Sequence, residues 1–270
     1  MQNSPKIREA QIRTISILGS GWLGMSLASH FLDRGDWVKV SSRSEKCFPE
    51  QIANSAQQFI VDIDQQDNDI TEFLQADILI INITSKDIAN YTQLIAKIEQ
   101  STIKNVLFVS STSVYANLNT IVNEEEGAEL GQSALYQIEQ LFSNNTHFLT
   151  TVVRFSGLIG YKRHPGRFFA PGKAVQQPYA PVNLIHRDDC IGIINAIIEQ
   201  NVWAEVFNGC ADTHPTKRQF YSHARNLLDL PAPDFVDEIK NAYKIVSNTK
   251  VKQYLNYQFK YPDVMDIRFE

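Results

Sequence analysis

The sequence predicts an α/β fold in which a doubly wound parallel sheet carries a smaller C-terminal lobe. Short apolar runs alternate with helical segments up to Arg154, as they do in chains of βα units. Several of these runs, such as 78–81, are apolar without alternation, which is typical of strands covered on both faces. The alternation ends after Arg154, so we expect a second, smaller unit beyond it.

The first part of the chain is expected to hold the sheet. Its strands are predicted at Thr14–Leu18, Trp37–Ser41, Gln58–Val61, Asp77–Ile81, Asn105–Ser110 and Phe148–Arg154. Helices are predicted at Gly21–Arg34, Asp87–Gln100 and Ser133–Ser143, because apolar residues recur there at helical spacing.

The later part of the chain is less regular. Residues 155–183 are rich in Gly, Pro and basic residues and show little periodicity. The elements predicted after them are a helix at Arg187–Gln200, a strand at Ala204–Phe207, and helices at Thr216–Leu228 and Ser247–Leu255. We therefore assign 12–160 to a sheet domain to which 184–212 return, and 161–183 and 213–270 to the smaller lobe.

Composition excludes several classes of function. The net charge of −5 gives no reason to expect nucleic acid or an anionic membrane as a partner. Cys47, Cys190 and Cys210 are far apart, which predicts neither a disulfide framework nor a zinc site. No apolar run approaches the ~20 residues of a membrane span, and residues 1–13 lack the apolar stretch of a signal peptide. We expect a cytoplasmic protein with a small-molecule substrate and no metal.

A glycine-rich turn directly follows the first expected strand. In a Rossmann βα unit the first glycine of such a turn permits the tight bend, the second lets the backbone approach phosphate, and the third lets the helix pack closely. Free N–H groups and the positive end of the helix dipole then face a pyrophosphate. A turn without a ligand is the alternative. The residues predicted to bind a dinucleotide here are Gly19, Ser20, Gly21, Trp22, Leu23 and Gly24.

The end of the second strand distinguishes NAD from NADP. An acid there binds the ribose of NAD, whereas Ser42 and Arg43 stand there in this chain and could bind the 2′-phosphate of NADP. NADP is therefore favoured over NAD and FAD, the alternative being that Arg43 is only a solvated loop residue. Asp62 and Ile63 could flank the adenine, unless Asp62 is a helix cap, and Asn82 is placed beside the cofactor.

Further motifs support a family resemblance. The fifth strand leads into Ser-Ser-x-x-Val-Tyr at 110–115, and three further motifs stand at 153–160, 182–189 and 247–257. With the glycine turn, these motifs resemble the extended short-chain dehydrogenase/reductase family, which includes NAD(P)-dependent sugar epimerases and dehydratases. The resemblance covers about residues 14–261. It implies that Ser111 hydrogen-bonds the reacting oxygen and that a homodimer could form through helices flanking this region.

The chain departs from this family at the catalytic Tyr-x-x-x-Lys pair. Counting along the chain places Tyr136 at the tyrosine, but Gln140 stands where the lysine should be. A second register places Gly131 and Leu135 in the two positions, and no lysine occurs in 105–161. A tyrosine needs a nearby cation to act as a base at neutral pH, because its ordinary pKa is about 10. The resemblance therefore implies an atypical member with an altered catalytic set.

A basic, aromatic loop at 161–169 follows the sixth strand. Together with 186–187 it could form a cationic wall for a phosphorylated or nucleotide-linked substrate, and a solvated loop anchored by its two phenylalanines is the alternative. Either of two histidines, His164 or His186, could replace the missing acid/base. The residues predicted to bind substrate are His164, Arg167, Asn183, His186 and Arg187.

Three functions are compatible with these features. The first is an NADP(H)-dependent oxidoreductase or epimerase/dehydratase-like enzyme acting through Ser111 and Tyr136 on a small anionic substrate. The second is a non-catalytic NADP(H)-binding sensor or scaffold protein, motivated by the missing lysine. The third is a relic that no longer binds a dinucleotide.

Overall fold

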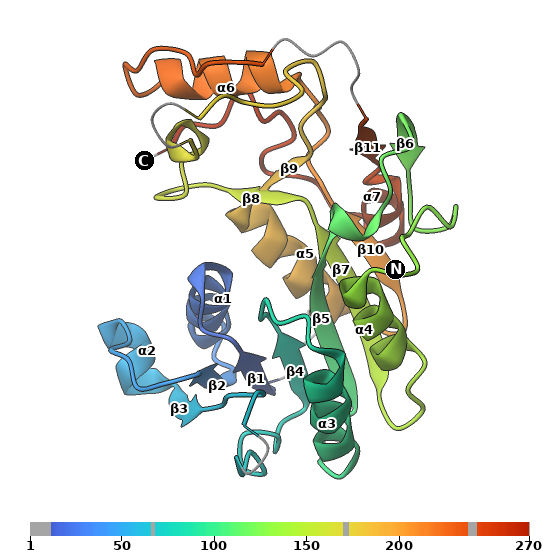
Figure 1. The fold of residues 1–270 in the computed structure, drawn as a ribbon. Helices are drawn as coiled ribbons and strands as arrows, with labels where there is room; N and C mark the ends of the chain where they lie inside the picture. Colours follow the sequence, from blue (N-terminus) through green and yellow to red (C-terminus); the bar gives the residue numbers. More distant parts are fainter. Residues whose placement is uncertain (1–11, 66–67, 170–172, 237–241, 270) are drawn as a thin grey trace, which may run out of the picture.

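The computed structural model describes residues 12–65, 68–169, 173–236 and 242–269. Its centre is a seven-stranded sheet in which every pairing is parallel (Figure 1). The strands are β1 (Thr14–Leu18), β2 (Trp37–Ser42), β3 (Gln57–Ile60), β4 (Ile78–Ile81), β5 (Asn105–Ser111), β7 (Leu149–Phe155) and β10 (Val206–Gly209). Their order is β10-β7-β5-β4-β1-β2-β3. Strand order reverses between β1 and β4, which is where open α/β sheets bind their ligands.

Helices cover both faces of the sheet, as the fold class predicts (Figure 1). One face is covered by α1 (Trp22–Asp33), α2 (Glu50–Ser55) and α5 (Arg187–Gln200), which pack on Ile15 and Ile17 of β1. The other face is covered by α3 (Ile88–Glu99) and α4 (Ala134–Ser143), which pack on Leu79 and Ile81 of β4. Because both faces are buried, the strands need no polar alternation. The predicted doubly wound sheet is confirmed.

Several short elements were not predicted. They are α2 and two pairs of parallel strands, β6 (Thr120–Val122) with β11 (Lys244–Val246) and β8 (Gly157–Ile159) with β9 (Leu184–His186). Residues 155–183, which show little periodicity in the sequence, include the strand β8. Strands of three residues paired across large sequence separations leave no periodic signal.

The smaller lobe lies beyond the carboxyl edge of the sheet, at the top of Figure 1. It contains α6 (Lys217–Asn226) and a short 3₁₀ turn at Pro165–Arg167, and the β8–β9 pair lies next to it. Its apolar cluster includes Ile159, Phe220 and Val264. The final helix, α7 (Thr249–Tyr254), returns to pack near β10. The domain boundaries given above stay a prediction.

The helices are short. None in the described part of the chain is long and apolar enough to cross a membrane.

Candidate active site

A cavity of about 400 Å³ opens at the carboxyl ends of β1 to β4, at the reversal of strand order. Eight of the residues predicted to bind the cofactor line it: Gly19, Ser20, Gly21, Ser42, Arg43, Asp62, Ile63 and Asn82. The other three predicted residues lie outside its lining. Leu23 and Gly24 are buried in the helix behind the turn, and Trp22 is half-buried beside the smaller lobe.

The backbone of the turn explains the position of each glycine. Gly19 has φ +102°, a conformation that side chains rarely tolerate. A Cβ atom on Gly24 would lie 2.0 Å from the carbonyl oxygen of Gly19, so only glycine lets α1 approach the turn this closely. A Cβ atom on Gly21 would have no heavy atom within 4 Å. Gly21 is also the N-cap of α1 and offers no side-chain cap, so the first N–H groups of the helix remain available to an anion.

Hydrogen bonds from neighbouring strands hold this turn in place. The Gly19 N–H donates to Ser41 Oγ at 3.2 Å, and the Ser20 N–H donates to the Ser41 carbonyl at 2.9 Å. Asn82 Nδ2 donates to the Gly19 carbonyl at 3.4 Å. Asn82 therefore lies against the turn as well as in the cavity.

Two cations lie on the segment that follows β2. Arg43 is exposed and lines the cavity. Lys46 Nζ donates to the Ser20 carbonyl at 2.7 Å, which brings a second cation to the glycine turn. Sequence reasoning missed Lys46, because only its fold back onto Ser20 reveals its position.

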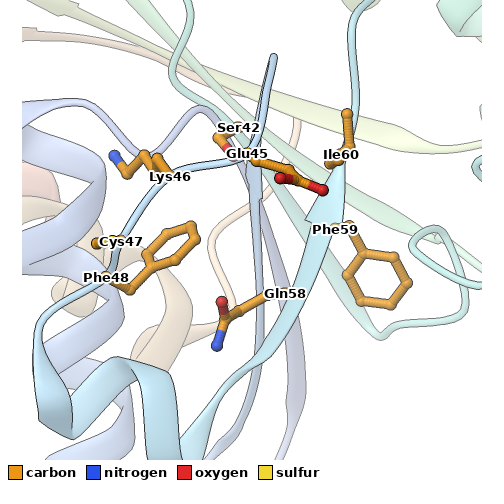
Figure 2. A pocket seen from close by; sticks show the side chains of 8 residues that line it. All are labelled: Ser42, Glu45, Lys46, Cys47, Phe48, Gln58, Phe59 and Ile60. Atoms are coloured by element: carbon orange, nitrogen blue, oxygen red, sulfur yellow. The ribbon is translucent and has the colours of Figure 1, made fainter.

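A second hollow of about 440 Å³ adjoins the first at Ser42 (Figure 2). It lies between the segment after β2 and the strand β3, and in Figure 2 the Lys46 ammonium points away from β3 while the Glu45 carboxylate points toward it. Asp62, at the end of β3, accepts from the Asp64 N–H at 3.1 Å. That bond closes a turn, so the helix-cap alternative for Asp62 is wrong.

The predicted catalytic residues lie at the ends of β5 and α4. Ser111 is half-buried, and its Oγ accepts from the Ser113 N–H at 3.1 Å. Tyr136 is half-buried on α4, with its ring 5.7 Å from the guanidinium carbon of Arg154. Gln140 is half-buried one turn further along α4. A cation therefore approaches Tyr136, but from β7 rather than from the helix position where the family has lysine.

Arg154 is only 2 % exposed and its charge is fully engaged. Its guanidinium contacts Glu139 at 2.7 Å and Glu129 at 2.5 Å, and it donates to the Tyr115 hydroxyl at 2.7 Å. The Ser110 hydroxyl donates to Glu139 as well. Burial raises the pKa of Glu139 and raises that of Tyr115 to about 12. This buried network, which sequence reasoning missed, matches one cation with two carboxylates and leaves no free positive charge for Tyr136.

The two predicted histidines serve as caps. His164 Nδ1 accepts from the Gly166 N–H at 3.0 Å, and His186 Nδ1 accepts from the Asp188 N–H at 3.2 Å at the start of α5. Both rings are buried, and burial lowers both pKa values, that of His186 to about 4. The neutral rings therefore dominate at pH 7, with one nitrogen already used by the backbone.

The remaining residues predicted to bind substrate are divided between two locations. Asn183 Nδ2 donates to the Lys244 carbonyl at 2.9 Å, which ties β9 to β11. Arg167 is exposed at the end of the 3₁₀ turn. Arg187 is half-buried, and its guanidinium carbon lies 5.0 Å from the centre of the Trp22 ring. Of these three, only Arg187 is brought to the glycine turn, through Trp22.

Comparison with known proteins shows what this architecture resembles. No family model matches the chain. Protein YeeZ of Escherichia coli is 27 % identical over 275 aligned positions, covering 96 % of this chain and all of that protein.

Solved structures resemble the chain along nearly its whole length. A proposed NAD-dependent epimerase/dehydratase from Methylobacillus flagellatus superposes with a TM-score of 0.78 at 23 % identity, covering 94 % of this chain and 95 % of that one. A UDP-glucuronic acid 4-epimerase from Bacillus cereus was solved with a fluorinated UDP-sugar and NAD. It superposes with a TM-score of 0.75 at 16 % identity, covering 94 % of this chain and 96 % of that one. With its strand order and glycine turn, the chain therefore has the fold of the extended, epimerase/dehydratase-like short-chain dehydrogenases/reductases, and Gln140 stands where the Tyr-x-x-x-Lys pattern has its lysine.

Proposed function

We propose that the protein binds NADP(H) in the cavity at the glycine turn and acts as an epimerase/dehydratase-like oxidoreductase on a small anionic or nucleotide-linked substrate. The observation that carries the proposal is the open space at Gly21, which lines the cavity and precedes α1 without a side-chain cap for the first N–H groups of the helix. A pyrophosphate fits this cradle by charge and by space. Bound cofactor would supply the hydride donor or acceptor.

The cations near β2 support NADP over NAD. Arg43 lines the cavity, Lys46 reaches the turn from the same segment, and Ser42 stands where NAD-binding proteins have an acid. A guanidinium donates two parallel hydrogen bonds to phosphate oxygens, which suits a 2′-phosphate. Glu45 points toward β3 in Figure 2, away from Lys46, so it does not neutralise the Lys46 ammonium.

In this proposal Ser111 hydrogen-bonds the reacting oxygen of the substrate, and Tyr136 exchanges the proton. Ser111 is suited to its role because its hydroxyl accepts from the Ser113 N–H and so keeps its own proton to donate. Tyr136 has no lysine beside it, and the nearby Arg154 is engaged by two carboxylates. We expect slow catalysis for this reason. The substrate and a homodimeric state remain proposals.

The paired charge of Arg154 also favours a second candidate function. A protein that binds NADP(H) without reducing or oxidising it would keep the open glycine turn and have no need for a cation free to activate Tyr136. Such a protein could act as a sensor or scaffold.

Two measurements separate these functions. Calorimetry should show NADPH binding to the wild type, and stopped-flow absorbance should show oxidation of the bound cofactor with at least one member of a panel of sugar nucleotides. We expect Ser111→Ala to lower that rate about 100-fold at unchanged NADPH affinity, while Ser113→Ala retains it, because the backbone N–H of residue 113 persists.

Each negative result has its own meaning. Tight NADPH binding without turnover across the panel would reject the enzyme and support the non-catalytic candidate. An unchanged melting temperature at millimolar NADPH would reject both, since a ligand well above its Kd stabilises the folded state by kilocalories.

A further inference from the structure

Two arginines, Arg163 from the loop 161–169 of the smaller lobe and Arg187 from the start of α5, converge on the first residue of α1. The guanidinium carbon of Arg187 lies 5.0 Å from the centre of the Trp22 ring, and that of Arg163 lies 5.8 Å from it. Trp22 directly follows Gly21, the open glycine of the turn. These two cations therefore lie beside the end of the helix that already favours an anion.

Neither guanidinium is neutralised. In the described ranges of the chain, neither Arg163 nor Arg187 forms an ion pair. The nearest acid in sequence, Asp188, is instead bound by Lys260 at 2.9 Å and by the Tyr161 hydroxyl at 2.9 Å. Two unpaired like charges near the same Trp22 ring favour an anion at this place.

The donors of the two groups are also incompletely used. Arg187 Nε is buried without a hydrogen-bond partner. Arg163 donates its Nε to the Leu158 carbonyl at 2.8 Å, which orients the guanidinium while leaving its two terminal nitrogens available. A buried donor without a partner destabilises the empty site, so a ligand oxygen that reached it would be favoured.

The local backbone is strained to place these groups. Arg187 is the first residue of α5, where the helix dipole disfavours a cation. Tyr161 adopts φ +50°, uncommon for a bulky residue, and its ring lies 4.0 Å from the Arg187 guanidinium carbon. The guanidinium is thus held between the rings of Tyr161 and Trp22. Such departures from local preference concentrate at functional sites.

We propose that Arg163 and Arg187 form a clamp over a diphosphate group bound at the N-terminus of α1, so that the ligand is held from the sheet and from the smaller lobe together. The proposal rests on the proposed dinucleotide site. The cofactor pyrophosphate is the favoured source, because Trp22 begins the helix that receives it; a substrate diphosphate beside the cofactor has the same chemistry.

Titration calorimetry with three probes tests the clamp. NADPH carries the diphosphate, adenosine 2′,5′-bisphosphate lacks it, and inorganic pyrophosphate is the bare group. We expect Arg163→Gln and Arg187→Gln each to weaken NADPH about tenfold, which is one lost charge-assisted contact, and to leave adenosine 2′,5′-bisphosphate unchanged. Arg218→Gln, which removes a guanidinium stacked on Tyr179 and Phe235 of the same lobe, should change neither affinity.

The remaining outcomes are decisive. If both glutamine variants bind NADPH normally but lose UDP binding to the NADPH-saturated protein, the clamp stands and its diphosphate belongs to the substrate. Unchanged affinities for NADPH, UDP and pyrophosphate would overturn it. If the wild type binds no NADPH, the proposed function fails, and pyrophosphate alone tests the clamp. Equal pyrophosphate affinity in the wild type and the glutamine variants would then overturn it. Arg163→Lys and Arg187→Lys, which keep the charge without the fork, replace any glutamine variant that does not fold.

Discussion

The two halves of the carboxyl edge of the sheet differ in whether their cations are paired with carboxylates. At the ends of β1 and β2, Arg43 is exposed beside a cavity and the backbone of Gly21 is bare. At the ends of β5 and β7, Arg154 is 2 % exposed and held by Glu129 and Glu139. The first half, called the open half below, leaves its hydrogen-bond donors available to a ligand. The second, called the closed half, uses its donors in internal ion pairs and hydrogen bonds. If the proposed function holds, cofactor binding and catalysis depend on separate halves of this edge.

The largest expected effect is on the closed half. Replacing Arg154 with methionine removes the cation and leaves two buried carboxylates unpaired, which we expect to lower the free energy of unfolding by about 3–5 kcal/mol. Urea denaturation measures it. The triple variant Arg154→Met, Glu129→Gln, Glu139→Gln should recover most of the loss. A single variant as stable as the wild type would mean that the network contributes little to folding.

The glycine turn provides a matched pair of substitutions on the open half. Gly24→Ala forces a Cβ to 2.0 Å from the Gly19 carbonyl, and we expect it to cost about 3 kcal/mol of stability and to abolish NADPH binding. Gly21→Ala meets no atom within 4 Å and has an ordinary φ of −72°.

For Gly21→Ala we expect stability within about 1 kcal/mol of the wild type but NADPH affinity reduced at least about tenfold, because the methyl group enters the phosphate space. Calorimetry and thermal melts distinguish the two variants. Equal NADPH affinity in Gly21→Ala and the wild type would contradict the proposed position of the phosphate.

Two tyrosines separate the structural role from the proposed catalytic one. The Tyr115 hydroxyl accepts from Arg154 at 2.7 Å and donates to Asn208 at 3.0 Å, so Tyr115→Phe should cost about 2 kcal/mol. Tyr136→Phe should change stability by less than about 0.5 kcal/mol, because in the described structure its hydroxyl forms no hydrogen bond. Turnover lost in Tyr136→Phe at full stability would assign it the proton step; unchanged turnover would remove it from the mechanism.

The smallest expected effect is on cofactor choice. Arg43→Glu should weaken NADPH about tenfold and leave NADH unchanged, because only NADPH carries the 2′-phosphate. Lys104→Glu makes the same charge change at the opposite edge of the sheet, just before β5, and is the control. If both variants weaken NADPH equally, the effect is one of overall charge, and Arg43 does not recognise the phosphate.

The sequence predicted the open half better than the closed one. The turn at 19–24 and the strand before it are contiguous, so spacing alone reveals them. The Arg154 network joins residues from β7, α4 and the segment after β6, and no periodicity relates them. Arg163 was passed over in favour of Arg167 for a similar reason, since only the fold shows which arginine of the loop meets Trp22. A site formed by contiguous residues can be predicted from the sequence, whereas a site formed by residues from distant segments cannot.

The route of the chain limits how the two lobes can move. After β8 it enters the smaller lobe, returns through β9, α5 and β10, leaves again for α6, and comes back through β11 and α7. A hinge between the lobes would have to bend at each of these crossings together. Adjustment to a ligand would instead fall to loops, among them the segment from Gly160 to Phe169, where Gly160 and Tyr161 have positive φ values. A bulkier ligand would then require a longer loop rather than a wider opening between the lobes.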